Sequence, residues 1–226
     1  MLKTAWLLFK KDITLERRSR EFIFTMLTFS LLTTLIFALS FFIESDVAKA
    51  YGPGVLWVVV LFGGTLGLQR LFESERENDC LGGILLSPAD PRSLYLSKVT
   101  FLIMFMVLME LIFVPAVFLF FDLFEGMSST TLFTISAVMI LGTLGFAIVG
   151  TLFAASLLNM RMREVLLPIV VYPLVTPVLI AGVQATRALL SGASPGEVAD
   201  WMLLIGAFDL IYLGVCLWLF PAMIRE

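Results

Sequence analysis

Six long apolar runs constrain this 226-residue chain more than any other feature of its sequence. A helix needs about 20 mainly apolar residues to cross the hydrocarbon core of a bilayer, and each run is long enough. None of the runs alternates apolar and polar residues as barrel strands do, so helices are favoured over strands. The predicted spans are Phe22 to Ile43, Tyr51 to Leu71, Leu94 to Phe121, Thr131 to Leu158, Val165 to Ala185 and Val198 to Pro221.

The composition indicates the same class of protein. Hydrophobic residues make up 60% of the chain and charged residues 15%, whereas soluble domains contain roughly 45–50% and about 25%. The first run is too long for the apolar core of a signal peptide and lacks a small-residue cleavage site. We therefore expect an all-α membrane protein with six transmembrane helices, in one domain over residues 1–226.

The basic residues predict which ends of the spans face the cytoplasm, because cytoplasmic loops collect lysine and arginine. Of the 15 basic residues, 13 precede the first span, flank the loop between the second and third spans, occupy the loop after the fourth, or follow the sixth. Only Lys49 and Arg187 fall on the other side. Both termini are therefore predicted to be cytoplasmic.

Residues 1–21 are too charged to span, yet Leu2, Trp6, Phe9 and Ile13 recur at helical spacing with lysines between them. We expect an amphipathic helix in the cytoplasmic interface, with Trp6 at headgroup level and the basic side toward anionic lipid. A solvated basic leader is the alternative interpretation.

The most polar stretch is LFESERENDCLGGILLSP, from Leu71 to Pro88, between the second and third predicted spans. Its first turn is acidic and exposed to solvent, and the apolar residues that follow lie on one face of a helix. Gly82 and Gly83 allow a short helix or helical turn at most. Ser87 and Pro88 end it, since the residue before a proline is pushed out of the α region. Residues 72–93 are therefore expected to form a separate cytoplasmic segment.

Other prolines predict where later helices begin and where one is interrupted. Asp90 and Pro91 are expected to restart a helix as its N-cap and first helical residue. The fifth span contains Pro168, Pro173 and Pro177. An interior proline removes a backbone hydrogen bond and clashes with the turn before it, so a kinked or discontinuous span is predicted there.

Residues 178–197 are predicted to form an outer re-entrant or short helical region. Thr186 to Ser191 could form a short helix at the outer surface before the sixth span begins. Ser194 and Glu197 fit the two ends of a capping box, with Pro195 as the first helical residue.

The residues needed for autonomous catalysis are missing from the sequence. The chain has no histidine, which removes the commonest general base and metal ligand. It contains no Walker A, GxGxxG or GxSxG motif, and Cys80 and Cys216 form no metal-binding motif. We expect no catalytic residue and no metal site, with any ATP hydrolysed by a separate chain.

Two acids lie inside apolar spans, Glu110 in the third and Asp209 in the sixth. Carboxylates in a membrane are costly and are candidates for functional sites. A functional contact and a structural hydrogen bond, for instance with Tyr212, are both open. Gly142, Gly145 and Gly150 of the fourth span are interpreted as sites of close helix packing.

These features together resemble a known family. A basic amphipathic N-terminal helix, six spans, an acidic cytoplasmic helix that ends on LLSP and a short re-entrant region before the sixth span resemble an ABC-2-type exporter permease. Within that class, the chain is similar to the haem exporter B family of bacterial cytochrome c maturation. The most specific pieces are Gln69-Arg70-Leu71-Phe72 and Ala207-Phe208-Asp209-Leu210. The similar stretches are Pro53 to Pro88, Leu141 to Ala155, Leu166 to Thr186 and Ala207 to Pro221.

This resemblance implies a set of partners in the bacterial inner membrane. They are an ABC ATP-binding subunit, a haem-handling membrane subunit, a small single-span subunit and a periplasmic haem chaperone, besides the lipid bilayer. A second copy of the chain is a further candidate, and no nucleic acid is expected. The chain alone is expected to bind no cofactor, since ATP would be bound by the partner subunit and haem handled by the complex. ATP hydrolysis would drive haem export or release of the haem-loaded chaperone.

In that class the segment between the second and third spans acts as a coupling helix, which docks on the ATP-binding subunit. Its apolar side chains are expected to enter a groove while its acids meet basic residues of the partner. The predicted docking residues are Glu73, Glu75, Arg76, Glu77, Leu81, Ile84, Leu85, Ser87 and Pro88.

Two other functions are compatible with the sequence. One is an ABC-2 permease for another cargo, such as a lipid-linked glycan or a drug. The other is an ion-coupled secondary transporter that uses Glu110 and Asp209, with the interrupted fifth span as its binding site.

Overall fold

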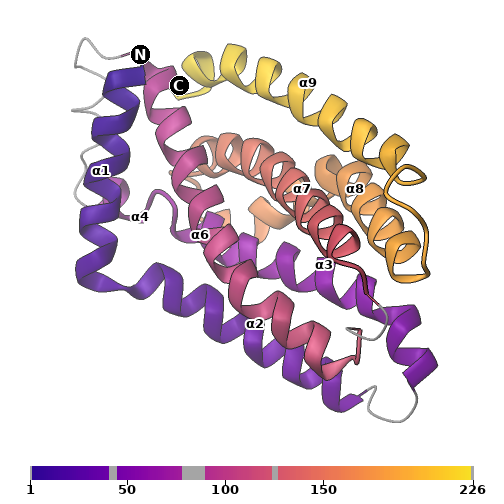
Figure 1. Ribbon diagram of the computed structural model, residues 1–226. Coiled ribbons are helices and arrows are strands. Elements are labelled where there is room, and N and C mark those ends of the chain that lie inside the picture. The colour runs from indigo at the N-terminus through magenta and orange to yellow at the C-terminus, as the bar shows by residue number, and fades with distance from the viewer. Residues whose placement is uncertain (1, 41–44, 78–89, 124–126, 225–226) are drawn as a thin grey trace.

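The computed structural model describes residues 2–40, 45–77, 90–123 and 127–224, and within these ranges the chain is a bundle of helices without strands (Figure 1). Five of the predicted docking residues, Leu81, Ile84, Leu85, Ser87 and Pro88, lie outside these ranges. In chain order, the helices are α1 Leu2–Ser19, α2 Glu21–Ser40, α3 Ser45–Arg70, α4 Glu73–Glu77, α6 Pro91–Phe120, α7 Ser129–Ser156, α8 Arg163–Leu190 and α9 Ala199–Met223.

The six predicted spans are confirmed as helices. By length and composition, α2, α3, α6, α7, α8 and α9 can each cross a membrane, with windows of mean hydropathy between 1.7 and 2.6. Much of their surface is apolar and exposed, as expected for helices that face lipid rather than water. The chain is therefore a multi-pass membrane protein.

Helix α1 is confirmed as a helix and lies across one end of the bundle, where it turns sharply into α2 (Figure 1). Leu2, Trp6, Leu7 and Leu15 are exposed, Leu2 at 78% and Trp6 at 63%. Leu8, Phe9 and Ile13 instead pack partly against the core. The corner is made by Arg20, whose φ of 58° lies in the left-handed region, which costs a non-glycine residue roughly 1–2 kcal/mol. The Glu16 carboxylate stabilises the corner by accepting a 3.1 Å hydrogen bond from the Ile23 backbone N–H in the first turn of α2.

Helix α7 lies at the centre of the bundle and contacts α3, α6, α8 and α9. Its glycines receive large side chains from two of these helices: Gly142 faces Trp57 of α3, Gly150 faces Leu68 of α3, and Gly145 faces Asp209 of α9. Any Cβ at these positions would collide with those side chains, which confirms that the glycines serve close packing.

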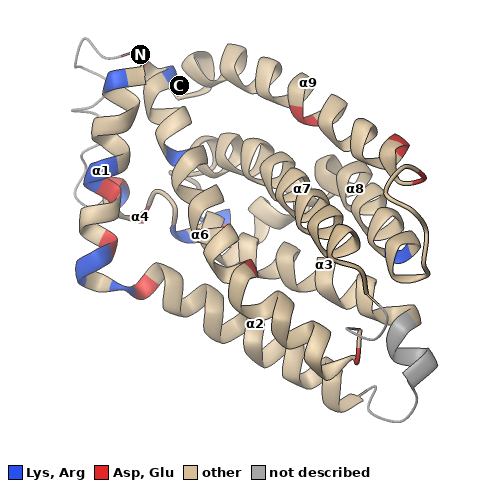
Figure 2. Cartoon of the chain, viewed as in Figure 1, with Lys and Arg blue, Asp and Glu red and all other residues tan. Residues whose placement is uncertain are grey.

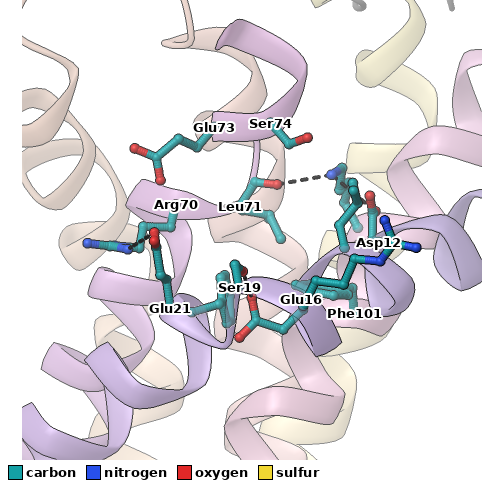
Figure 3. A pocket seen from close by; sticks show the side chains of 13 residues that line it. Asp12, Glu16, Ser19, Glu21, Arg70, Leu71, Glu73, Ser74 and Phe101 are labelled. Carbon is teal, nitrogen blue, oxygen red and sulfur yellow. Dashed lines mark hydrogen bonds and ion pairs between the residues drawn. The ribbon is translucent and has the colours of Figure 1, made fainter. Parts of the chain in front are cut away.

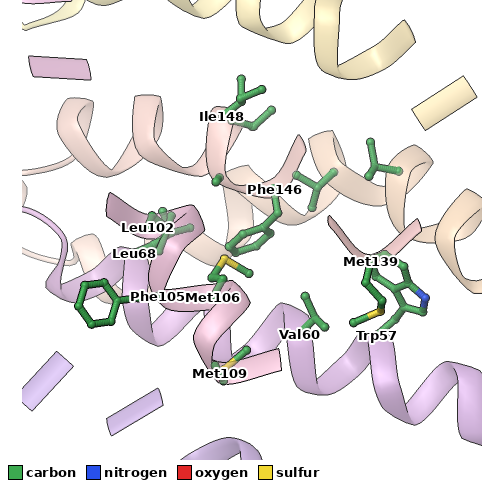
Figure 4. Packing of buried hydrophobic residues seen from close by; sticks show 14 of the residues in the cluster. Trp57, Val60, Leu68, Leu102, Phe105, Met106, Met109, Met139, Phe146 and Ile148 are labelled. Atoms are coloured by element: carbon green, nitrogen blue, oxygen red, sulfur yellow. The ribbon is translucent and has the colours of Figure 1, made fainter. Parts of the chain in front are cut away.

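Trp57 lies at the centre of this packing, and Figure 4 shows it beside the apolar side chains of the core. Its ring is 2% exposed and fits against Gly142 of α7 and Gly182 of α8. The indole N–H donates to the Thr186 hydroxyl at 3.1 Å, so the one polar atom of the ring is satisfied. Three helices therefore meet around one aromatic side chain.

The predicted restart of the chain at Asp90 and Pro91 is confirmed. Asp90 is the N-cap of α6, and its carboxylate accepts a 3.0 Å hydrogen bond from the Arg92 backbone N–H. Pro91 is the first helical residue, where its missing N–H costs no helical hydrogen bond.

The predicted discontinuity of the fifth span is wrong, because α8 continues through Pro168, Pro173 and Pro177. A kink at these prolines stays a prediction. Each proline withdraws a single N–H, and the remaining helical hydrogen bonds carry the chain past it. The separate short helix predicted over Thr186 to Ser191 is also absent, since residues 186–190 are the last turn of α8.

The connection between α8 and α9 begins as a turn. There, Ser194 donates to the Glu197 carboxylate from its backbone N–H at 3.3 Å and from its hydroxyl at 2.8 Å. The two ends of the predicted capping box therefore meet. However, α9 begins at Ala199, with Val198 as its N-cap, and not at Pro195.

The basic residues gather at one end of the bundle, as Figure 2 shows along α1 and near the start of α6. Both marked chain ends lie at this end in Figure 1. The charge asymmetry seen in the sequence is therefore an asymmetry of the folded bundle.

Candidate functional site

The charged end of the bundle holds the described part of the predicted docking segment. After α3, Leu71 and Phe72 turn inward and are buried, and α4 then carries Glu73, Glu75 and Arg76. Glu73 is half-buried and Arg76 is exposed, whereas Glu75 is only 1% exposed. The side chain of Glu77 lies outside the described part of the chain. These residues therefore do not share one outward face.

Glu75 belongs to a cluster of four charges, called here the α4 ion-pair network: Lys11 and Asp12 of α1, Glu75 of α4 and Lys98 of α6. Three of the four are buried, and Lys11 is partly exposed. Lys98 Nζ lies 2.8 Å from Glu75 Oε2 and 3.1 Å from Asp12 Oδ2, and it donates to the Leu71 carbonyl at 3.0 Å. Lys11 Nζ lies 2.5 Å from Glu75 Oε1 and 3.1 Å from Asp12 Oδ1. Two ammonium groups face two carboxylates, so the network is neutral as a whole.

Burial gives this network its energetic importance. Asp12 and Lys98 are 6% and 2% exposed, and the Lys98 ammonium also lies 5.2 Å from the centre of the Phe72 ring. A buried charge that loses its partner is strongly destabilising. Burial opposes the charge of Lys11, but Glu75 and Asp12 outweigh it and raise the pKa of the Lys11 ammonium above its ordinary value. The network therefore ties α1, α4 and α6 together at one point.

The sequence pattern predicts that Glu75 lies on a partner surface and does not connect it with Lys11, Asp12 or Lys98. One signal was available, because Lys98 lies within the third predicted span, where a lysine requires a partner. Its partners lie on α1 and α4, far from it in the sequence, and helical periodicity does not connect segments so far apart.

A proline-linked contact joins α3 to α8 beside this network. Pro168 has no N–H for the Glu164 carbonyl four residues earlier, and Gln69 Nε2 donates to that oxygen at 3.2 Å. In return, the Arg163 guanidinium donates to the Gln69 carbonyl. The junction that carries the family resemblance is therefore bound to the first turn of α8 in both directions.

A second proline-linked contact joins α6 to α9. Pro221 leaves the Leu217 carbonyl without its helical donor, and Arg92 Nε donates to that oxygen at 3.1 Å. Carbonyls freed by prolines in membrane helices need a substitute donor. Here the substitute comes from another helix, which fixes the start of α6 against the end of α9.

The intramembrane acid Glu110 has a hydrogen-bond partner. It is 6% exposed on α6 and accepts a hydrogen bond from the Thr143 hydroxyl of α7. This is the hydrogen bond between neighbouring helices that the sequence left open, and a functional contact of Glu110 stays a prediction.

Asp209 differs, because neither of its oxygens has a hydrogen-bond partner in the described part of the chain. It is 4% exposed on α9 and faces Gly145 of α7. The hydroxyl of Tyr212 donates to the Leu174 carbonyl at 2.6 Å, so it does not serve Asp209. Glu110 and Asp209 thus contact α7 at Thr143 and Gly145, residues that point to different sides of a helix.

A pocket of about 510 Å³ opens at the corner between α1 and α2, called here the α1–α2 pocket (Figure 3). Part of the α4 ion-pair network lies in its wall, and a 3.4 Å ion pair joins Arg70 to Glu21 beside it. The lining residues are Asp12, Leu15, Glu16, Arg18, Ser19, Glu21, Phe22, Arg70, Leu71, Glu73, Ser74, Lys98 and Phe101. Among the residues that the structure describes, no group of three or more metal-binding side chains is present.

Comparison with known proteins identifies the family of this chain. It matches the CcmB protein family over residues 3–226. Heme exporter protein B of Pseudomonas aeruginosa is 28% identical over 90% of this chain and 89% of its own length. Heme exporter protein B of Escherichia coli K12 is 29% identical over 42% of this chain and 43% of its own length. Since the match spans almost the whole sequence and all six spans, the chain belongs to the CcmB protein family.

Proposed function

We propose that this chain is the membrane permease subunit of an ABC-type complex in cytochrome c maturation. The observation that carries the proposal is the family match over residues 3–226, together with relatives named Heme exporter protein B. In this role the chain is not an enzyme. ATP is hydrolysed by a separate ATP-binding subunit, and the energy drives export of haem or release of a haem-loaded periplasmic chaperone.

The α4 ion-pair network supplies a physical route for this coupling. Helix α4 ends at Glu77, directly before the rest of the proposed docking segment. Any force on that segment pulls on Glu75, which is bound to Lys98 of α6 and Lys11 of α1. Because Asp12, Glu75 and Lys98 are buried together, separating them is costly, and α1, α4 and α6 are expected to move as a unit.

The proposed orientation puts the charged end in the cytoplasm of a bacterium, with the spans in its inner membrane. The gathering of basic residues at the end with α1, α4 and the start of α6 supports this, because cytoplasmic ends of spans are rich in lysine and arginine (Figure 2). The docking segment then faces the cytosol, where an ATP-binding subunit is found. The haem-handling membrane subunit, the single-span subunit and the periplasmic chaperone are proposed as further partners.

Co-purification tests the docking role. With the ATP-binding subunit co-expressed, Leu81→Asp together with Leu85→Asp should abolish its recovery with this chain in mild detergent, while the variant still inserts. The matched control is Met160→Asp with Met162→Asp, which changes two exposed apolar residues in the loop before α8 at the same end of the bundle. Recovery of the ATP-binding subunit with the Leu81 and Leu85 variant would reject the docking role.

The partnerless carboxyl of Asp209 favours one other function, ion-coupled transport through the spans. Glu110→Gln combined with Asp209→Asn distinguishes the two. If transport or chaperone release survives this double change and stops with an inactive ATP-binding subunit, ion coupling is excluded. If activity is lost in the double variant and persists with an inactive ATP-binding subunit, the ABC-type role is excluded.

A further inference from the structure

The α1–α2 pocket is placed where the headgroups of a bilayer would meet the protein. One wall comes from α1, which also exposes apolar residues such as Trp6 and Leu7. The start of α2, the first span, lies beside it, and α3, α4 and α6 supply the rest of the lining. A helix of the first kind lies in the interface, and the end of a span reaches the same level. The corner between them is therefore open to lipid headgroups.

The charges in this pocket are of both signs. The basic side chains are Arg18, Arg70 and Lys98, and the acidic ones are Asp12, Glu16, Glu21 and Glu73. Acids outnumber bases by one, so a purely anionic ligand gains little from the site as a whole. A ligand that carries one positive and one negative group matches it better.

Not all of these charges are occupied within the chain. Lys98 and Asp12 belong to the α4 ion-pair network, and Arg70 is paired with Glu21 at the surface. Arg18 and Glu73 make neither a hydrogen bond nor a salt bridge with the rest of the described chain. The Arg18 guanidinium and the Glu73 carboxylate thus line the same cavity without a hydrogen bond or a salt bridge, although Glu73 also attracts the Arg163 guanidinium. Figure 3 shows Glu73 above the Arg70–Glu21 pair.

The rest of the lining is apolar. Leu15 is partly exposed, while Phe22, Leu71 and Phe101 are buried beside the charged groups. A headgroup alone would leave this surface uncovered, whereas the glycerol and first acyl carbons of a lipid would cover it. The mixed lining therefore fits a lipid better than a small soluble ion.

We propose that the α1–α2 pocket binds the headgroup of an aminophospholipid. The phosphate lies beside Arg18 and Arg70, whose guanidinium groups suit phosphate oxygens. The primary ammonium points toward Glu73 and Glu16 and donates hydrogen bonds to their carboxylates. A choline headgroup lacks these N–H donors, and a glycerol headgroup lacks the positive charge.

Binding is tested with the purified full chain, delipidated in a neutral detergent, by its affinity for short-chain phosphatidylethanolamine, phosphatidylcholine and phosphatidylglycerol. The ethanolamine lipid should bind most tightly. Arg18→Gln and Glu73→Gln should each weaken its binding by on the order of tenfold, the loss of one charge-assisted hydrogen bond. Arg17→Gln is the control, because Arg17 is exposed on the same helix and does not line the pocket. Unchanged thermal unfolding of the variants shows that they are folded.

Several results would overturn the proposal. Equal or tighter binding of phosphatidylglycerol would show a general attraction to anionic lipid, as would an equal loss with Arg17→Gln. Equal binding of glycerophosphoethanolamine, which has no acyl chains, would assign a soluble phosphate ester instead. Loss of lipid binding when the ATP-binding subunit is present would assign the pocket to a basic side chain of that partner.

Discussion

Replacing Lys98 by methionine tests whether the α4 ion-pair network stabilises the protein. Methionine keeps most of the aliphatic length but removes the ammonium, so two buried carboxylates are left with one cation, Lys11. Removing one partner of a buried pair costs about 3–5 kcal/mol. Because Lys11 still lies 2.5 Å from Glu75 and 3.1 Å from Asp12, we expect the lower end, about 3 kcal/mol.

A double-mutant cycle isolates the interaction between the two charges. Glu75→Gln alone leaves one buried cation in excess, whereas Lys98→Met with Glu75→Gln restores neutrality between Lys11 and Asp12. The double variant should therefore be less destabilised than the sum of the singles, by about 1.5–3 kcal/mol. Unfolding in dodecyl sulfate, followed by tryptophan fluorescence, measures the free energy of each variant.

Proteolysis provides a second reading of the same variants. If the network holds α1 in place, Lys98→Met should speed tryptic cleavage at Arg17 and Arg18, which are exposed on α1. Lys10→Met is the control, since Lys10 is exposed and forms none of the network's contacts. A destabilisation by Lys98→Met no larger than that of the control, or strictly additive effects in the cycle, would refute the reasoning.

Three further outcomes are expected in the same unfolding assay. Trp57→Phe should lower the free energy of unfolding by about 2 kcal/mol, because it removes the indole hydrogen bond and leaves a void between helices. Trp218→Phe is the control: this side chain is 73% exposed, and its replacement should change stability by less than about 0.5 kcal/mol. Gly145→Ala should cost about 1–3 kcal/mol through its collision with Asp209, and Asp209→Ala in the same chain should recover part of the loss. The stability lost in Lys11→Met should be constant near neutral pH and shrink as the pH rises above 10.5. The pKa of Lys11 is raised in the folded protein, so its ammonium contributes stability until it deprotonates in the folded state.

The local features of this fold were predictable because each follows from nearby residues. The length of the apolar runs determines the six spans. The start of α6 follows from the capping chemistry of Asp90 and the fixed φ of Pro91. The spacing of Leu2 and Trp6 is enough to predict α1. In each case the deciding residues belong to one continuous stretch of the sequence.

The contacts between helices were not predictable in the same way. Glu75 looks like a surface acid because its neighbours in the sequence are charged, and only the fold brings Lys98 and Lys11 to it. The prolines of α8 predicted a break, because each one removes a backbone hydrogen bond within its own helix. At Pro168, however, Gln69 of α3 donates to the carbonyl oxygen that the proline leaves without a helical donor. Such contacts cannot be predicted from nearby residues, because the compensating group is distant in the chain.

The glycines of α7 bear on the order in which the protein is assembled during its synthesis. Trp57 and Leu68, which fill Gly142 and Gly150, are on α3 and enter the bilayer before α7. The side chain that covers Gly145 is on α9, which is synthesised after α7 and α8. The face of α7 with Gly142 and Gly150 can therefore pack against α3 as soon as α7 inserts, whereas the face with Gly145 is covered only when α9 is synthesised. A chain that stops before α9 would insert most of its spans yet leave the Gly145 face of its central helix uncovered.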